Sequence, residues 1–502
     1  MERRDFLKLA LMSALAGQVA VDLCPAGARG IPAAAFPGFP PGKCYQGPPT
    51  GVIGTTLTEL FKVGPGPSSS HTIAPLRIAN HFWAVLEGLP EDALRRGARI
   101  EARLYGSLSA TGRGHRTDRA ILAGLLGQKP ETCDTRLMDE LQDPTRKYVV
   151  AVRGVGFELS GATIVWDKHE HDYPFANTMV MRLLAADGSV VCEREYYSTG
   201  GGFFAWKGQP AEGRGTPVYP YGSMARFREI VQTSGKSLDE IMLANEKAIR
   251  RVGEWEIYAH LDLVLATMEE GVRLGLSEEG LLPAPFEFHR KAKQIYERSL
   301  SAGADERFMG LLSSYALAVS EGNAAGRLAV TAPTLGSAGT MPAIAYYMKN
   351  HLKLPREAMR RGLLAAGLVG FLCKNNASVA GAEVGCQGEI GVASAMAAAM
   401  LAHATGAPLD VTELAATIAL EHHLGMTCDP VGGYVLLPCI ERNAFGAVKA
   451  YNAWLIAKSE IAGRHWEDLD RVIAAMLETG RAMPPQFRET GKGGLATVMV
   501  SC

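Results

Sequence analysis

The chain has 502 residues, a net charge of -1 and a hydrophobic fraction of 47%. This length predicts two or three domains, and the near-zero charge excludes the basic field with which proteins attract nucleic acid or anionic lipid. Because no apolar run approaches the ~20 residues needed to cross a bilayer, we predict a globular protein with no nucleic-acid partner and no stable membrane insertion.

The first 50 residues have the pattern of an export signal followed by a tether. Arg3 and Arg4 precede Phe6 and an apolar stretch, the order of a twin-arginine (Tat) signal, which would carry the folded protein to the periplasm. The alternative is an N-terminal extension of a cytoplasmic protein, because Asp22 interrupts the apolar stretch. Residues 25–50 are rich in Pro and Gly and predict a tether without a packed core.

Residues 51–215 alternate helical and strand patterns. Residues 72–86 place apolar side chains at helical spacing, and residues 99–105 alternate as a half-buried strand does. Residues 179–198 predict two strands joined at Ala186-Asp187-Gly188. We therefore expect a mixed α/β domain here.

Residues 210–224 are dense in Gly and Pro and predict a connection between domains. Beyond them nearly everything is helical, with helical patterns over 238–280, 287–322, 342–373, 387–405, 411–424, 443–463 and 466–480. The predicted fold class is α+β, with the mixed α/β domain at 51–215 followed by a larger all-α domain at 225–502.

Three of the nine cysteines, Cys386, Cys428 and Cys439, lie in segments rich in small residues and close to charged ones. Such a setting surrounds a sulfur with backbone amides, as an iron-sulfur cluster requires. Cys386 also precedes a small-residue helix, whose N-terminus favours a thiolate. On spacing alone the alternative is buried, unreactive cysteine.

Seven segments together resemble the iron-sulfur-dependent L-serine dehydratase (L-serine ammonia-lyase) family, in the form that joins both halves of the enzyme in one chain. They are VGPGPSSSHTIAP (63–75), YGSLSATGRGHRTD (105–118), YYSTGGGF (196–203), VTAPTLGSAG (330–339), NASVAGAEVGCQGEIGVA (376–393), CDPVGGYVLLPCIERNA (428–444) and RETGKGGLA (488–496).

The resemblance implies that Cys386, Cys428 and Cys439 hold a [4Fe-4S] cluster with one iron left open. That iron would act as a Lewis acid on the substrate hydroxyl, so no pyridoxal phosphate is expected. Family members commonly end in or beside a cysteine that ligates the fourth iron at rest, which assigns this role to Cys502; the alternative is a frayed terminal residue. A homodimer is expected by family analogy.

The segment around Ser68, Ser69, Ser70, His71 and Thr72 predicts a turn leading into a helix. Its hydroxyls and free amides are suited to holding a substrate carboxylate, and the alternative role for these residues is helix capping. His71 is the candidate base for the α-proton, because an imidazole titrates near neutrality.

Other positions in the matching segments also have candidate roles. His115 competes with His71 as the base. The resemblance gives Asn376 and Arg442 a role in binding the amino acid, and Arg442 is equally explained by a structural ion pair. Phe175 and Leu335 depart from the residues usual in the family, which puts strict specificity for serine in question.

The sequence thus predicts a cluster-dependent lyase of amino-acid degradation that converts L-serine to aminoacrylate, which hydrolyses to pyruvate and ammonia. Two rival hypotheses remain open. One is the same chemistry on L-threonine or L-cysteine, and the other is a non-catalytic exported protein that binds an amino acid or senses oxidation.

Overall fold

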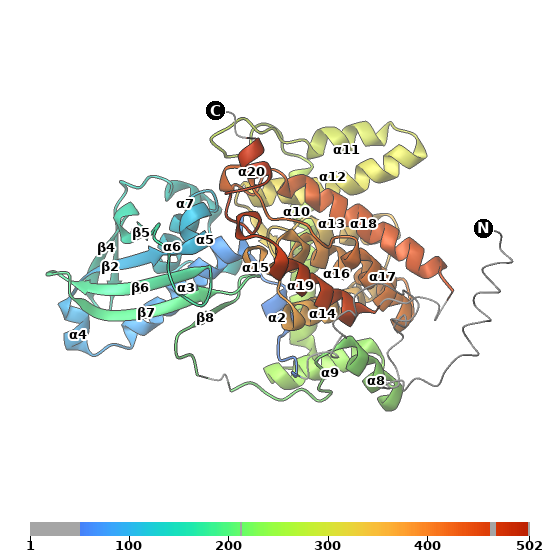
Figure 1. Ribbon diagram of the computed structural model, residues 1–502, viewed down its shortest axis with the longest axis horizontal. Coiled ribbons are helices and arrows are strands. Elements are labelled where there is room, and N and C mark those ends of the chain that lie inside the picture. The colour runs from blue at the N-terminus through green and yellow to red at the C-terminus, as the bar shows by residue number, and fades with distance from the viewer. Residues whose placement is uncertain (1–50, 211–212, 462–467, 500–502) are drawn as a thin grey trace, which may run out of the picture. The chain divides into compact units, whose positions relative to one another are not determined.

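The structure is a computed structural model that describes residues 51–210, 213–461 and 468–499. The predicted export signal and tether, and Cys502, lie outside these residues. Within the described part, the predicted α+β class is confirmed, because strands are concentrated before residue 207 and helices dominate after residue 223 (Figure 1).

A five-stranded sheet organises the N-terminal domain. Its strand order is β5-β2-β6-β7-β8, in which only the β5–β2 pair is parallel. A separate hairpin pairs β3 with β4. The strands are β2 (Gly97–Leu104), β3 (Tyr148–Val152), β4 (Val155–Leu159), β5 (Ile164–Trp166), β6 (Thr178–Ala185), β7 (Val190–Ser198) and β8 (Phe204–Trp206).

Two of the predictions for this domain are confirmed: the strand at 99–105 is β2, and the hairpin at 179–198 is β6 and β7. Helices pack against the sheet through one apolar cluster that includes Phe82, Ile121 and Met181. They are α3 (Ala74–Glu87), α4 (Glu91–Arg96), α5 (Gly106–Thr111), α6 (Thr117–Leu125) and α7 (Thr135–Glu140).

The helical domain is built around α16, in which every residue except His403 is buried. Its Ala-rich surface lets α13, α14, α17 and α18 pack closely around it (Figure 1). The helices are α8 (Met224–Ser234), α9 (Leu238–Arg250), α10 (Glu254–Gly275), α11 (Ala292–Leu300), α12 (Ala304–Ala324), α13 (Thr340–Asn350), α14 (Arg356–Asn376), α15 (Gly381–Val384), α16 (Ile390–Ala404), α17 (Leu409–Glu421), α18 (Cys439–Ser459), α19 (Leu469–Ala482) and α20 (Leu495–Val498).

Three of the long helical ranges predicted from the sequence are each two helices. The range 238–280 breaks at Arg251, whose φ of 57° is left-handed and ends α9. The range 342–373 breaks before α14, where Pro355 is the N-cap. The range 287–322 is divided between α11 and α12 at Gly303, the N-cap of α12. Apolar periodicity continues across these breaks, so it did not reveal them.

The start of the described chain packs in the helical domain rather than on the sheet. Leu57 and Phe61 belong to the same apolar cluster as the helices, and the Leu57 amide donates to Glu246 Oε2 at 3.0 Å. The short helix α2 (Leu57–Leu60) is followed by β1 (Val63–Pro65), which pairs antiparallel with β9 (Leu328–Val330). This N-terminal arm, residues 53–65, therefore fixes the next residues, 66–73, beside the helical domain.

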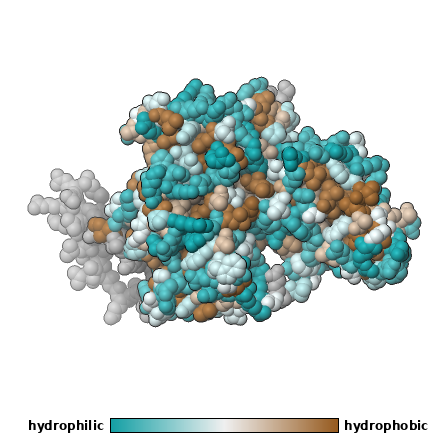
Figure 2. Space-filling model, turned by 180° about the vertical axis from the view of Figure 1, so that it is seen from behind, coloured by the Kyte–Doolittle hydropathy of each residue, from teal (hydrophilic) through white to brown (hydrophobic). Residues whose placement is uncertain are grey.

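Among the described residues, no helix is both long and apolar enough to span a bilayer. On the face seen in Figure 2, hydrophilic residues cover most of the surface and hydrophobic residues lie in separate patches.

Candidate functional site

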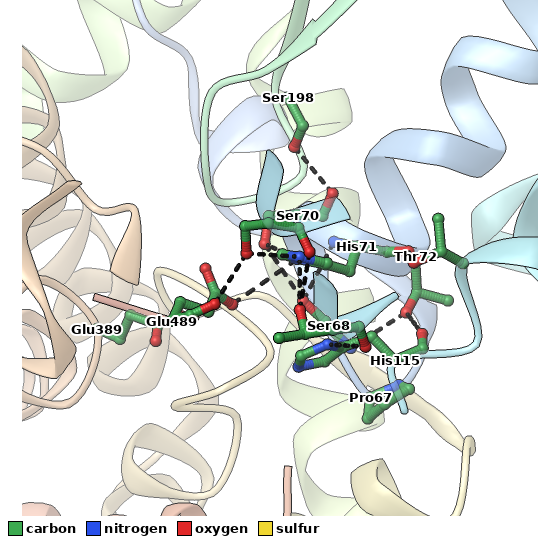
Figure 3. A network of polar contacts seen from close by, with 12 residues as sticks. Pro67, Ser68, Ser70, His71, Thr72, His115, Ser198, Glu389 and Glu489 are labelled. Carbon is green, nitrogen blue, oxygen red and sulfur yellow. Dashed lines mark hydrogen bonds and ion pairs between the residues drawn. The ribbon is translucent and has the colours of Figure 1, made fainter. Parts of the chain in front are cut away.

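The predicted turn at residues 68–72, here called the site turn, lies at the junction of the two domains. A π-helical turn over Ser69–Ile73 leads directly into α3, and all of its residues are buried. Ser68 Oγ accepts the His71 amide at 3.2 Å, which is the helix-capping alternative considered for this segment. The Ser70 carbonyl accepts a hydrogen bond from Ser198 Oγ at 2.9 Å, which ties the site turn to the end of β7 (Figure 3).

The two candidate bases lie together. The rings of His71 and His115 have their centroids 4.5 Å apart, and both side chains are buried. Burial, and then the charge of His115, hold the pKa of His71 well below its ordinary value. Burial lowers the pKa of His115 to about 4. Both imidazoles are therefore neutral near pH 7, and a neutral imidazole can accept a proton.

Two hydroxyls on α5 contact the Nε2 side of the His71 ring. Ser107 Oγ is 3.2 Å and Thr111 Oγ1 is 3.1 Å from His71 Nε2. On the other side of the ring, Ser70 Oγ is 2.9 Å from His71 Nδ1. The Thr111 carbonyl also accepts from His115 Nδ1 at 2.9 Å. One turn of α5 thus orients both imidazoles.

The three predicted cysteine ligands converge in the helical domain, and all three are buried. Cys386 begins the short 3-10 helix before α16, as predicted, and Cys439 begins α18. The Cys386 and Cys428 sulfurs and a Glu389 carboxylate oxygen lie within 4.8 Å of one another.

The charge around these thiols fits a bound metal group. The pKa of Cys428 is raised first by a hydrogen bond with Cys386 and then by burial. The pKa of Cys439 is raised first by burial and then by the charge of Cys386. Burial also raises the pKa values of Glu389 and Glu489. These acidic groups lie close together, with too few cationic side chains beside them to neutralise their charges. A soft metal centre bound here would displace the thiol protons and take the thiolates as ligands.

Space beside the sulfurs is kept open by a glycine. A Cβ on Gly381 would lie 3.1 Å from Cys428 Sγ and 2.9 Å from Glu389 Oε2. The donor set and this cradle therefore fit an iron-sulfur cluster.

Arg442 forms the structural ion pair considered as its alternative role. Its guanidinium donates to the Thr427 carbonyl at 2.6 Å and to Asp429 Oδ1 at 3.0 Å. Burial opposes its charge, but the thiolates of Cys386 and Cys439 raise its pKa above the ordinary value. Arg442 is thus placed to compensate part of the negative charge of the thiols.

A C-terminal segment, residues 487–495, joins the two halves of the site, and we call it the strap. The Cys428 amide donates to the Phe487 carbonyl at 2.8 Å, and the Glu489 amide donates to the Cys428 carbonyl at 2.7 Å. The Glu489 carbonyl in turn accepts from Ser107 Oγ at 2.9 Å. In Figure 3 the Glu489 side chain points toward His71, and its Oε1 lies 3.7 Å from His71 Nδ1.

The glycine triplet at residues 200–202 brings the N-terminal domain against the cysteine-bearing segment. A Cβ on Gly200 would lie 2.9 Å from the Ala380 Cβ, and one on Gly201 would lie 3.2 Å from the Pro333 carbonyl oxygen. All three glycines have positive φ. The triplet thus permits close approach of protein backbone.

A cleft of about 1130 Å³ lies beside these groups. It is lined from both domains, by Ser107, His171 and Phe175 on one side and by Glu383 and Arg488 on the other. Since Ser107 contacts His71, the cleft leads toward the two imidazoles.

Other sequence-predicted residues lie elsewhere or have structural partners. Asn376 ends α14 and donates to the Gly222 carbonyl at 2.8 Å, with no contact to the cysteines among its hydrogen bonds. Thr72 Oγ1 donates to the His115 carbonyl at 2.7 Å. Leu335, one of the departures from the family pattern, is buried in the helical core.

Four residues of the site were missed by the sequence analysis. Glu389 follows Cys386 by three positions, so helical spacing could have indicated it, and Glu489 is part of the matching segment at 488–496. Ser107 and Thr111 also lie in a matching segment, four positions apart on one face of a helix.

Comparison with known proteins agrees with this arrangement. Residues 56–209 match the family described as serine dehydratase beta chain, and residues 233–496 match the family described as serine dehydratase alpha chain. The chain is 39% identical over 460 residues to an L-serine dehydratase of Streptomyces coelicolor and 40% identical over 463 residues to one of Haemophilus influenzae. Each alignment covers 89% of this chain and 99% of the relative. An L-serine dehydratase of Helicobacter pylori is 35% identical over 465 residues, covering 88% of this chain and 99% of the relative.

Proposed function

Because the chain belongs to the serine dehydratase family, with the beta and alpha portions joined in one polypeptide, we propose that it is a lyase that converts L-serine to pyruvate and ammonia. The observation that carries this proposal is that Glu489 connects the buried His71–His115 pair to Cys428, whose sulfur lies close to that of Cys386.

In this proposal Cys386, Cys428 and Cys439 hold a [4Fe-4S] cluster, which when bound supplies a Lewis acid for the departing hydroxyl. The fit rests on the soft donor set, on the space beside Gly381 and on the excess of buried acidic groups around the sulfurs. Arg442 stabilises the thiolates, because its guanidinium lies among them and Asp429.

The chain's own residues handle the proton and orient the substrate. His71 accepts the α-proton of serine, since burial keeps its ring neutral at the pH of catalysis. The site turn binds the substrate carboxylate through hydroxyls and amides near the start of α3. His115, whose ring lies beside that of His71, disfavours a second positive charge and so favours return of the proton to solvent.

The overall reaction balances without an external reductant or oxidant. The Cα–H bond breaks, its electron pair forms the Cα=Cβ bond, and the β-hydroxyl leaves as water, which gives aminoacrylate. Aminoacrylate then takes up one water and releases ammonia to give pyruvate.

Anaerobic reconstitution with iron and sulfide tests the proposal, with keto acid measured from L-serine, L-threonine and L-cysteine in parallel. We expect pyruvate from L-serine at the highest kcat/KM. Iron binding without keto acid from any of the three amino acids would refute the lyase function, and a preference for L-threonine or L-cysteine would correct the substrate.

We further propose that Cys502 binds the cluster at rest and is displaced by substrate, a role supported by the resemblance of residues 488–496 to the family's C-terminal segment. A C502S variant should lose any lag in progress curves at low serine. An unchanged lag would exclude this role.

The N-terminal twin-arginine pattern supports a proposal of Tat export, and the family analogy supports a homodimer. Cell fractionation with N-terminal sequencing tests the first, because a cytosolic chain that keeps Met1 would contradict it. Light scattering of the purified protein tests the second.

A further inference from the structure

The hydrogen bonds around His71 determine which of its ring nitrogens carries the proton. A carbonyl oxygen only accepts hydrogen bonds, whereas a hydroxyl has a single proton to donate. Ser107 Oγ is 2.9 Å from the Glu489 carbonyl, and Thr111 Oγ1 is 3.0 Å from the Ser107 carbonyl. The Glu489 carbonyl has no other donor among the described residues, so Ser107 must donate to it; Thr111 donates to the Ser107 carbonyl, which also accepts a backbone amide within α5.

With their protons used in this way, both hydroxyls can only accept from His71. Their oxygens lie 3.2 Å and 3.1 Å from Nε2, so Nε2 must be the donor and carry the ring proton. The other tautomer would face a lone pair of Nε2 with the lone pairs of these oxygens, or would take from the buried Glu489 carbonyl the one donor that the described residues give it.

Nδ1 is then the unprotonated nitrogen, whose lone pair accepts a hydrogen bond from the Ser70 hydroxyl. It faces Ser70 Oγ at 2.9 Å and Glu489 Oε1 at 3.7 Å, on the side of the thiols. His115 has the opposite tautomer, because its Nδ1 lies 2.9 Å from the Thr111 carbonyl and must donate to it. Thr111 thus helps to fix the tautomer of both rings. Its hydroxyl accepts from His71 Nε2, and its carbonyl accepts from His115 Nδ1.

We propose that Ser107 and Thr111 are positioning residues that fix His71 as the Nε2-protonated tautomer, so that Nδ1 is the atom that takes the α-proton of the substrate. The inference rests on the proposed function, in which His71 is the base. It adds the reacting atom and two residues that the sequence analysis did not single out.

The geometry also explains why the strap is needed on the histidine side. The Glu489 carbonyl holds the Ser107 proton away from His71, and the Glu489 amide is held by the Cys428 carbonyl. Correct docking of the strap beside the thiols is therefore coupled to the correct tautomer of His71.

Nitrogen NMR of the reconstituted protein labelled with ¹⁵N-histidine tests the proposal directly, because protonated and unprotonated ring nitrogens resonate far apart. A H71Q variant identifies the His71 signals among those of the twelve histidines. We expect a protonated Nε2 and an unprotonated Nδ1 near pH 7.5. The reverse pattern would overturn the proposal.

Variants give a second, kinetic test. T111V and S107A should each lower kcat about tenfold with little change in KM, the double variant should lower it further, and T111S should restore most of the rate. The NMR signals of T111V and S107A should shift toward a mixture of tautomers. S109A is the matched control, because the Ser109 hydroxyl on the same helix has no hydrogen-bond partner among the residues that the structure describes. Wild-type kcat and an unchanged tautomer in the double variant would overturn the proposal.

Failure of the proposed function gives a different result. If H71Q makes pyruvate at the wild-type rate, His71 is not the base, whatever its tautomer. If H71Q is inactive and His71 carries its proton on Nδ1, the base assignment stands and the positioning role is wrong.

Discussion

Glu489 Oε1 lies 3.7 Å from His71 Nδ1, although the two residues come from opposite ends of the described chain. The main chain of Glu489 is held on one side by Cys428 and on the other by Ser107. A single residue of the strap thus contacts both the thiol side and the imidazole side of the site.

Glu489→Ala should lower kcat for pyruvate formation about 10- to 100-fold, because the Glu489 carboxyl lies 3.7 Å from Nδ1, the atom of His71 that takes the proton. Iron and sulfide content should stay near wild type, since the bonds of Glu489 to Cys428 and Ser107 are made by its main chain. Steady-state kinetics and metal analysis measure both. Thr497→Ala, an exposed change in the same C-terminal region, serves as the control. A wild-type kcat in the Glu489 variant would contradict the prediction.

Gly381→Ala should prevent cluster loading while leaving the fold intact. The new methyl group would lie 3.1 Å from Cys428 Sγ and 2.9 Å from Glu389 Oε2, in the space proposed for the cluster. Iron and acid-labile sulfide after anaerobic reconstitution should fall several-fold, with an unchanged far-UV circular dichroism spectrum. Gly303→Ala is the control, because no atom of the described part of the chain lies within 4 Å of its added Cβ. Full loading of the Gly381 variant would place the cluster elsewhere.

Gly200→Ala should destabilise the protein more than Gly188→Ala. The two glycines have nearly the same φ, 85° and 84°, so each substitution costs about 1–2 kcal/mol for the left-handed backbone. Only at Gly200 does the added Cβ also overlap Ala380, at 2.9 Å, and such overpacking costs about 1–3 kcal/mol more. Urea unfolding curves compare them, and equal destabilisation would show that the contact between the domains is loose at this point.

Stability should fall as the pH is lowered from about 6.5 to 4, in part through His423. Burial lowers its pKa to about 4 in the folded protein, whereas the ordinary value is 6.5. Between these values the unfolded chain binds the extra proton, so the free energy of unfolding rises with pH, by about 1.4 kcal/mol per pH unit for one such histidine.

Replacement of His423 should therefore reduce this slope. Urea midpoints at pH 7 and pH 5 should differ less in H423Q than in the wild type, while the exposed His289→Gln change leaves the difference unaltered. Equal slopes in H423Q and wild type would show that His423 is not a source of the acid sensitivity. His115, whose pKa is also about 4, contributes in the same direction.

Local features of the fold could be predicted from the sequence because neighbours in the chain determine them. The β6–β7 hairpin follows from alternating residues around a turn, and the helix after Cys386 follows from its run of small residues. At Arg251 and before Pro355 one helix ends and another begins, although the apolar spacing continues across each break. Periodicity alone therefore predicted one long helix where the structure has two.

For the site, the sequence identified individual residues but not the long-range contacts between them. The cysteines and His71 were identified by residue type and motif, but their partners come from long-range contacts. Ser107 looks like an ordinary residue near a helix start, and Glu489 looks like a charged residue of a C-terminal tail. Their importance depends on hydrogen bonds between segments that only the folded chain brings together.

The N-terminal arm has a consequence for the connectivity of the enzyme. Since Leu57 and Phe61 are buried among the helices and β1 pairs with β9, the two halves interlock by more than the peptide that links them. A chain nicked within residues 207–222 would stay assembled. If the same sequence were split at that point into two separately translated polypeptides, this arm would join them, together with the contacts of the glycine triplet and of the strap.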